Sequence, residues 1–260
     1  MALRQPRARG IPLRAFAPNA VTALALCSGL TGVRYGISGE WERAAAMILL
    51  AGALDGIDGR IARLVRGESR FGAELDSLAD SISFGVSPAL VIYLWSLRDL
   101  PRIGWIAALV YAVFAALRLA RFNANIDVVE QPHKSAGFLT GVPAPAGAGL
   151  AMLPMFLWFW TGEDVFRAPE LVTPWVAFVA FLMVSNLATF SWSSLRLRRT
   201  IRFEAIIFVV VLAAAMVSAP WQTLTVVCAV YLATMPFSIA SYARIRRQRE
   251  VAPEPQSPAA

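Results

Sequence analysis

The sequence predicts an all-α, polytopic membrane protein, a helix bundle with about eight transmembrane helices. Of its 260 residues 57% are hydrophobic and only 16% are charged, and the mean hydropathy is +0.57. These values lie outside the range of ordinary soluble domains. Apolar stretches of about 20 residues, long enough to cross roughly 30 Å of hydrocarbon, recur along nearly the whole chain. The composition therefore argues against a water-soluble enzyme.

Eight apolar segments are expected to form the spans, and Pro, Gly and charged residues gather between them. In chain order their approximate limits are 19–37, 41–63, 72–97, 103–121, 142–160, 172–192, 203–219 and 222–242. The predicted organisation is a basic juxtamembrane segment (1–18), a membrane-embedded catalytic domain (19–242) and a basic, Pro/Ala-rich tail (243–260).

Charge predicts the orientation of these spans. The chain carries 24 basic and 17 acidic residues, a net charge of +7. If the connections alternate between the two sides of a membrane, 19 of the 24 Lys and Arg residues fall on the side of both termini. Short cytoplasmic loops collect positive charge. We therefore expect both termini to be cytoplasmic at the cell (inner) membrane, with the excess charge facing anionic lipid and not nucleic acid.

Four aspartates stand where the second span ends and the third begins: Asp55, Asp58, Asp76 and Asp80. Spacings of three and four residues place each pair on one helix face. Because a short cytoplasmic loop joins the two spans, the two acidic faces are expected to meet near the membrane surface. An acid at bilayer depth costs about 2.5–3.5 kcal/mol. Arg-paired acids at helix ends are the alternative, but four acids with this spacing favour a functional site.

Carboxylates that face one another repel unless they are protonated or bind cations. Oxygen-only ligation favours Mg²⁺ or Mn²⁺, and two such ions can neutralise phosphate oxygens during group transfer. Gly56 and Gly59 leave room beside the acids, and the guanidinium of Arg63 suits bidentate phosphate contact. The pattern predicts a two-metal, phosphate-ester site, and its position at the lipid interface suggests that one substrate is a lipid.

The acids belong to a longer pattern, Asp55-x2-Asp58-Gly59-x2-Ala62-Arg63-x8-Gly72-x3-Asp76-x3-Asp80. At every fixed position it resembles the signature of the CDP-alcohol phosphotransferases. The resemblance implies that Asp55, Asp58 and Asp76 ligate metal. It implies that Asp80 contacts the second metal and acts as the general base. It also implies a homodimer and a set of contacts to CDP-diacylglycerol: Asn19, Thr22, Gly59, Ala62, Arg63, Ser69 and Gly72.

Residues around the signature look like the branch of this family that transfers to serine, notably 75–88, 118–123 and 134–143. This implies transfer of a phosphatidyl group from CDP-diacylglycerol to the hydroxyl of L-serine, with CMP released. The carboxylate of serine needs a cationic partner, and three cations predicted on the same side could supply it: Arg118, Arg121 and Lys134.

Two alternatives stay open at this point. The acceptor could be glycerol 3-phosphate, although that branch usually has Pro after the third Asp and Lys after the fourth, where this chain has Ser77 and Ser81. Outside enzymes, intramembrane carboxylates often mark the ion path of a cation transporter. All four acids are predicted near one surface beside an Arg-rich loop, which favours phosphate chemistry.

Overall fold

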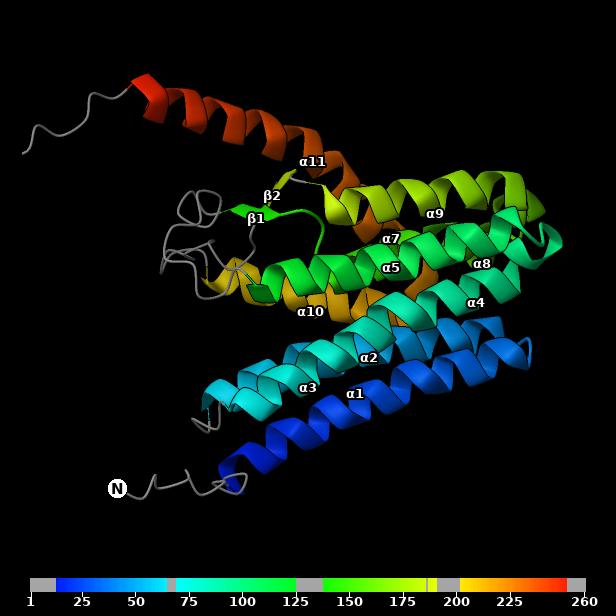
Figure 1. Ribbon diagram of the computed structural model, residues 1–260, viewed down its shortest axis with the longest axis horizontal. Coiled ribbons are helices and arrows are strands. Elements are labelled where there is room, and N and C mark those ends of the chain that lie inside the picture. The colour runs from blue at the N-terminus through cyan, green and yellow to red at the C-terminus, as the bar shows by residue number, and fades with distance from the viewer. Residues whose placement is uncertain (1–12, 65–68, 125–137, 186, 191–201, 252–260) are drawn as a thin grey trace, which may run out of the picture.

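The computed structural model describes residues 13–64, 69–124, 138–185, 187–190 and 202–251. Its helices run lengthwise beside one another (Figure 1), as the predicted helix bundle requires. In chain order the elements are α1 (Leu13–Ile37), α2 (Trp41–Leu64), α3 (Arg70–Asp80), η1 (Ser81–Val86), α4 (Ser87–Trp95), η2 (Leu97–Asp99), α5 (Ile103–Ala124), β1 (Phe138–Thr140), α7 (Ala144–Ala151), α8 (Leu153–Thr161), η3 (Asp164–Arg167), α9 (Pro169–Val184), β2 (Ala188–Phe190), α10 (Arg202–Ser218) and α11 (Pro220–Val251).

Every predicted apolar segment is helical over most of its length. Within the described residues three helical stretches are long and apolar enough to cross a membrane: Phe16–Ile37, Arg70–Trp95 and Ile103–Ala124. Two shorter apolar helices are Pro169–Val184 and Ile207–Ser218. A count of eight spans stays a prediction. The turns after α1, α4 and α8 lie at one end of the bundle, and the end of α2, the start of α3 and the strand pair lie at the other (Figure 1).

Small residues allow α1 and α2 to pack closely as an antiparallel hairpin. Gly39 in the turn has a φ of +75°, a left-handed conformation that favours glycine. A Cβ on Gly32 would lie 3.0 Å from the carbonyl oxygen of Ala44. The hydroxyl of Ser28 donates to the carbonyl of Met47 at 2.7 Å. Close backbone approach and hydrogen bonds between helices are the usual basis of helix association in lipid.

The third predicted span is one helical rod with a π-helical segment in its middle. α3 leads into η1, and the N–H of Ser87 donates to the carbonyl of Ile82 five residues earlier. The rod presses against α1 at this point, because a Cβ on Gly29 would lie 2.9 Å from Cα of Ser83. Hydropathy predicts the rod but not the π turn.

The fifth predicted span is divided into α7 and α8 at Met152. Pro154 has no N–H, so the carbonyl of Leu150 lacks its α-helical donor. The indole N–H of Trp175 in α9 donates to this carbonyl at 2.8 Å. A side chain from another helix therefore replaces a backbone donor.

The sixth predicted span, 172–192, is too long at its C-terminal end. α9 ends at Val184, and β2 then pairs antiparallel with β1. Beside the pair the N–H of Gly141 donates to the carbonyl of Leu187 at 2.8 Å. A Cβ on Gly141 would lie 2.6 Å from the carbonyl oxygen of Met183. This long-range pairing ends the helix, and a hydropathy window cannot detect it.

The helix boundaries also differ at the two ends of the chain. α1 begins at Leu13, inside the predicted juxtamembrane segment 1–18. α11 continues to Val251, into the predicted tail 243–260. The rest of both predicted segments lies outside the described residues.

The core lies where the rod formed by α3, η1 and α4 meets α5, α8 and α9. Its largest fully buried side chains include Phe84, Trp95, Tyr111 and Phe156. Trp95 packs on Trp158 with the ring centroids 5.9 Å apart. This core anchors α4, which continues from the acid-bearing helix α3.

Substitution Gly29→Ala should destabilise the bundle, because the new methyl group would overlap the backbone of Ser83. Overpacking of this kind costs about 1–3 kcal/mol. Gly52→Ala is the control, since its Cβ would make ordinary contact with Phe84 at 3.6 Å. Thermal unfolding of the purified protein in detergent should show a lower melting temperature for Gly29→Ala only. Equal melting temperatures would contradict the close contact between α1 and η1.

Candidate active site

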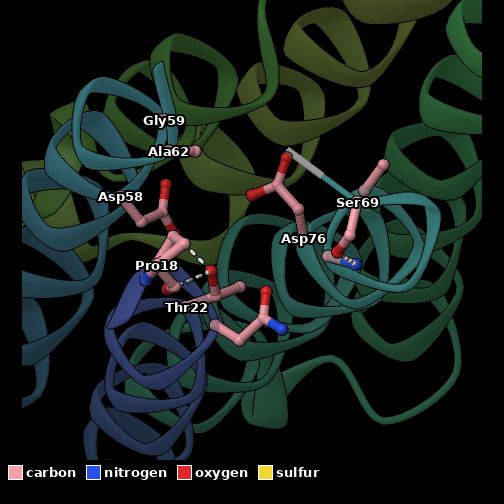
Figure 2. Close-up of a pocket in the computed structure, with 10 residues that line it drawn as sticks. Pro18, Thr22, Asp58, Gly59, Ala62, Ser69 and Asp76 are labelled. Carbon is pink, nitrogen blue, oxygen red and sulfur yellow. Dashed lines mark hydrogen bonds between the residues drawn. The ribbon is translucent and has the colours of Figure 1, made fainter. Parts of the chain in front are cut away.

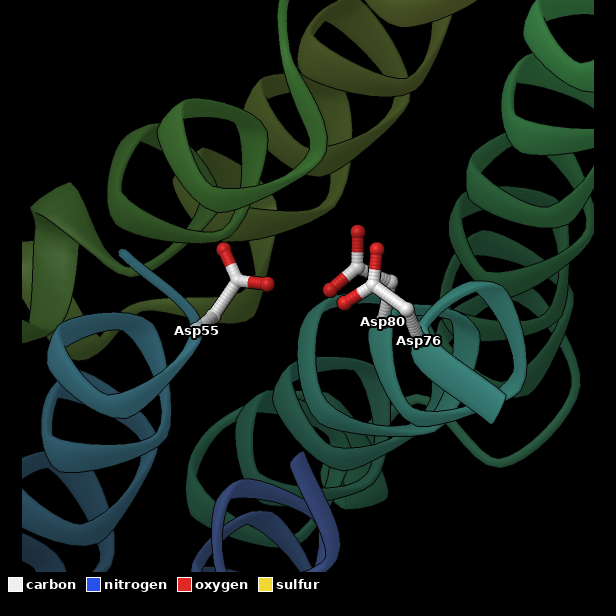
Figure 3. Close-up of side chains that lie close together, drawn as sticks. All are labelled: Asp55, Asp76 and Asp80. Carbon is white, nitrogen blue, oxygen red and sulfur yellow. The ribbon is translucent and has the colours of Figure 1, made fainter. Parts of the chain in front are cut away.

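Three aspartates from two helices, α2 and α3, come together. Carboxylate oxygens of Asp55, Asp76 and Asp80 all lie within 4.8 Å of one another. Figure 3 shows Asp76 and Asp80 side by side on α3, one turn apart, with Asp55 of α2 facing them. The predicted meeting of two acidic helix faces is confirmed for these three residues.

The chemistry of this cluster fits a divalent cation. Each of the three side chains can offer an oxygen ligand, and oxygen ligands are those that Mg²⁺ and Mn²⁺ prefer. The three carboxylates are half-buried, so little water screens their mutual repulsion. A bound cation would remove that repulsion. The residues present therefore suit a metal, and Asp55, Asp76 and Asp80 would hold it.

Asp58, the fourth predicted ligand, is held separately. Its side chain is only 4% exposed, and its Oδ2 lies 2.6 Å from the hydroxyl of Thr22 in α1. A hydrogen bond to a buried carboxyl group fixes its orientation. Asp58 also interacts electrostatically with Asp55 and Asp76, so it lies beside the cluster, and its role as a ligand stays a prediction.

A cavity of about 150 Å³ opens between α1, α2 and the start of α3, directly beside the acids (Figure 2). Six of the seven residues predicted to contact the nucleotide lipid line it: Asn19, Thr22, Gly59, Ala62, Ser69 and Gly72. Asp58 and Asp76 line it too. Residues up to 58 positions apart in sequence thus form one hollow, and two of the proposed metal ligands are part of its wall.

Local backbone geometry explains several of these residue types. Ser69 caps α3 by accepting a hydrogen bond from the N–H of Gly72 at 3.0 Å. A Cβ on Gly72 would lie 2.8 Å from Oδ1 of Asn19, so a glycine is needed for α1 to approach. A Cβ on Gly56 or Gly59 would meet nothing within 4 Å, which confirms the predicted room beside the acids.

The cationic residues that were predicted to contact substrates differ in their burial and in their contacts. Arg63 is exposed near the end of α2 and does not line the cavity. Arg118 of α5 is half-buried and interacts electrostatically with Asp80. Arg121 is exposed and donates to the carbonyl of Val184 at 3.3 Å.

Lys134 lies outside the described residues, so its predicted contact with serine is not located.

Sequence reasoning missed one residue that lines the cavity and one contact between helices beside the site. Ala73 lines the cavity, and its neighbour Gly72 was the only signal; Pro18, which also lines it, belongs to the Pro18-Asn19-x2-Thr22 sequence that resembles the family. Asn123 at the end of α5 donates to the hydroxyl of Ser77 at 2.9 Å, which ties α5 to α3 next to the acids. No local pattern marks that contact, because the two residues are 46 positions apart.

Models of two known protein families match most of the helices of the bundle. The model of the CDP-alcohol phosphatidyltransferase family matches residues 15–188. A second family model, described as CDP-alcohol phosphatidyltransferase 2, matches residues 201–236. The first match contains every described residue of the cavity and the acidic cluster.

Curated proteins named CDP-diacylglycerol–serine O-phosphatidyltransferase are similar over most of this chain. The Mycobacterium tuberculosis protein is 37% identical over 252 residues, which cover 95% of this chain and 86% of the relative. The Mycobacterium leprae protein is 36% identical over 255 residues, 97% of this chain and 82% of the relative. The Helicobacter pylori protein is 36% identical over 180 residues, 68% of this chain and 72% of the relative.

Substitution Thr22→Val should destabilise the protein, because it removes the donor to the buried carboxyl group of Asp58. Loss of a partner of a buried polar group costs about 1–3 kcal/mol. Thr31→Val on the same helix is the control, since the hydroxyl of the half-buried Thr31 donates to the backbone carbonyl of Cys27 at 2.6 Å and not to a carboxyl group. Thermal unfolding should separate the two variants. If Thr31→Val lowered the melting temperature as much as Thr22→Val, the hydrogen bond to Asp58 would contribute no extra stability.

Proposed function

Because the chain belongs to the CDP-alcohol phosphatidyltransferase family, we propose that it transfers a phosphatidyl group from CDP-diacylglycerol to the hydroxyl of L-serine. The products are phosphatidylserine and CMP. The names of the relatives support serine as the acceptor. The observation that carries the proposal is the cluster of Asp55, Asp76 and Asp80 beside a cavity lined by the residues of the signature.

The cavity is proposed to receive the nucleotide end of CDP-diacylglycerol. Its lining is small or polar, with Gly59, Ala62 and Gly72 leaving space and Asn19 and Ser69 offering hydrogen-bonding groups. Arg63, exposed just beyond the cavity, is proposed to approach the diphosphate once the donor is bound. The acyl chains would then extend into the surrounding lipid.

The acidic cluster is proposed to hold Mg²⁺ or Mn²⁺ as a two-metal site, with Asp58 completing the ligand set beside Asp55, Asp76 and Asp80. When bound, the ions would neutralise charge on the diphosphate oxygens. All four carboxylates are carried by helices and not by loops, which gives the ligand set a well-defined geometry.

Asp80 is proposed to act as the general base. It takes the proton of the serine hydroxyl, and the serine oxygen forms a bond to the phosphorus that carries diacylglycerol. The bond from this phosphorus to the bridging oxygen of the diphosphate breaks, and CMP leaves with that oxygen and its electron pair. Arg118 interacts with Asp80 from the side of α5 and helps to hold it in place.

Serine recognition is proposed to use Arg118, Arg121 and Lys134. Support comes from Arg118, whose Nε is buried without a hydrogen-bond partner among the described residues. The same guanidinium interacts electrostatically with the proposed base and is suited to the carboxylate of serine. Arg121 and Lys134 would bind the same carboxylate from the rim of the site.

The apolar helices and the similarities to the relatives identify an integral membrane protein. We place it in the cell (inner) membrane with the active site and both termini cytoplasmic, where 19 of the 24 basic residues would lie. The end of α2 and the start of α3 lie at the end of the bundle opposite the turns after α1, α4 and α8 (Figure 1), which fits this orientation. A homodimer is part of the proposal.

The acceptor is tested with purified protein, CDP-diacylglycerol and Mg²⁺ or Mn²⁺, by following CMP release. We expect release with serine at a rate at least about tenfold above that with glycerol 3-phosphate, inositol or choline, as pockets that hydrogen-bond their substrate discriminate strongly. Faster CMP release with glycerol 3-phosphate than with serine would show that glycerol 3-phosphate, and not serine, is the acceptor. Cation uptake into vesicles without CMP release would instead favour a transporter.

Substitution Asp80→Asn should reduce kcat by about 10²–10⁴-fold, the usual contribution of general base catalysis, while CDP-diacylglycerol still binds. Glu74→Gln is the matched control, because Glu74 is exposed on the same helix. Substrate binding is measured separately by calorimetry. Undiminished turnover in Asp80→Asn would remove Asp80 from the role of base.

A further inference from the structure

Pro88 interrupts the backbone hydrogen bonds of the acid-bearing rod two turns after Asp80. Without an N–H it cannot donate to the carbonyl of Phe84, four residues earlier. Both residues are buried, and a buried carbonyl without a donor is costly, above all where water is absent. The rod forms the π turn η1 at this place.

Tyr111 of α5 supplies the missing donor. Its hydroxyl lies 2.9 Å from the carbonyl oxygen of Phe84, and its side chain is fully buried at 0% exposure. This bond joins two helices at residues 27 positions apart. It stabilises the rod in its wide turn, because it satisfies the carbonyl that Pro88 leaves open.

One face of α5 follows the rod back toward the acids. Three α5 residues with the spacing i, i+4 and i+7 lie on this face. Each interacts with a different residue of the rod: Tyr111 donates to the carbonyl of Phe84, Ala115 packs against Gly85, and Arg118 interacts electrostatically with Asp80. The second contact is tight, since a Cβ on Gly85 would lie 3.1 Å from Cβ of Ala115.

We infer that Tyr111 is a positioning residue for the reaction, because it holds the π turn that orients Asp80 toward Asp55. Each residue of an α-helix adds about 100° of rotation about the helix axis. The extra residue of a π turn therefore rotates the side chains of α3 about this axis relative to those of α4. α4 is anchored in the core by Ile92 and Trp95. Any change in the turn would therefore rotate the acids and not the anchored helix. This inference rests on the proposed function.

Substitution Tyr111→Phe tests it, since it removes only the hydroxyl. We expect kcat for CMP release to fall at least about tenfold, because small misplacements of catalytic groups have large effects on rate. KM for CDP-diacylglycerol should change less than kcat, because six of the ten residues that line the cavity belong to α1 and α2, which a change in the turn does not rotate. An unchanged kcat would overturn the inference.

Trp175→Phe is the matched control for a merely structural effect. It removes the comparable side-chain donor to the carbonyl of Leu150, which Pro154 leaves open. Trp175 lines neither the cavity nor the acidic cluster. We expect a lower melting temperature in both variants and a lower kcat in Tyr111→Phe alone. A similar loss of kcat in both variants would reduce Tyr111 to a structural role and overturn the inference.

A double-mutant cycle with Pro88→Ala tests the route of the effect. Alanine restores an N–H at position 88, which gives the carbonyl of Phe84 a second donor. In this background Tyr111→Phe should lower kcat by less than about threefold. The same tenfold loss with and without Pro88 would show that Tyr111 does not act through this carbonyl.

Failure of the inference is distinguishable from failure of the proposed function. If the unsubstituted protein releases no CMP with any acceptor, the proposed function fails. If it releases CMP and Tyr111→Phe matches it in kcat, only the positioning role is overturned. The acceptor with the highest rate is used throughout the series.

Discussion

Repulsion among the carboxylates of Asp55, Asp76 and Asp80, within 4.8 Å of one another, is the interaction that the surrounding structure must balance. The helices that carry them are supported from two sides. α1 packs closely through Gly29 and Gly32 and reaches Asp58 through a hydroxyl group. On the other side α5 contacts the acid-bearing rod and brings a guanidinium toward the cluster. Packing of α1 and α5 thus holds the three carboxylates close together, in an arrangement that suits a bound cation.

A second constraint comes from apolar surroundings, where backbone carbonyls need donors from within the protein. Prolines at positions 88 and 154 each remove a helical donor, and in both places an aromatic side chain of another helix replaces it. Tyr111 does so on the rod that carries Asp80, whereas Trp175 belongs to neither the cavity nor the acidic cluster. The same device therefore stabilises the bundle in one place and, by our inference, orients a catalytic group in the other.

The location of the site suits a reaction between a nucleotide lipid and a water-soluble alcohol. The acids lie within the last ten residues of α2 and within α3, and the cavity beside them has a small and partly polar lining. A headgroup can enter there while the acyl chains stay in the bilayer. Similarity to the serine transferases extends over 95% of the chain, so it includes the helices beyond the signature that would complete an acceptor site.

Composition and spacing alone determined the helical membrane fold and the meeting of two acidic helix faces, while the resemblance to the CDP-alcohol phosphotransferases indicated six of the residues that line the cavity. The first two follow from local rules, because hydropathy sets helix length and spacings of three and four set a helix face. The π turn, the strand pair that ends α9 at Val184, and the partners of Asp58 and Phe84 were decided only in the tertiary structure. Each depends on contact between residues far apart in sequence, and no local pattern specifies such a contact.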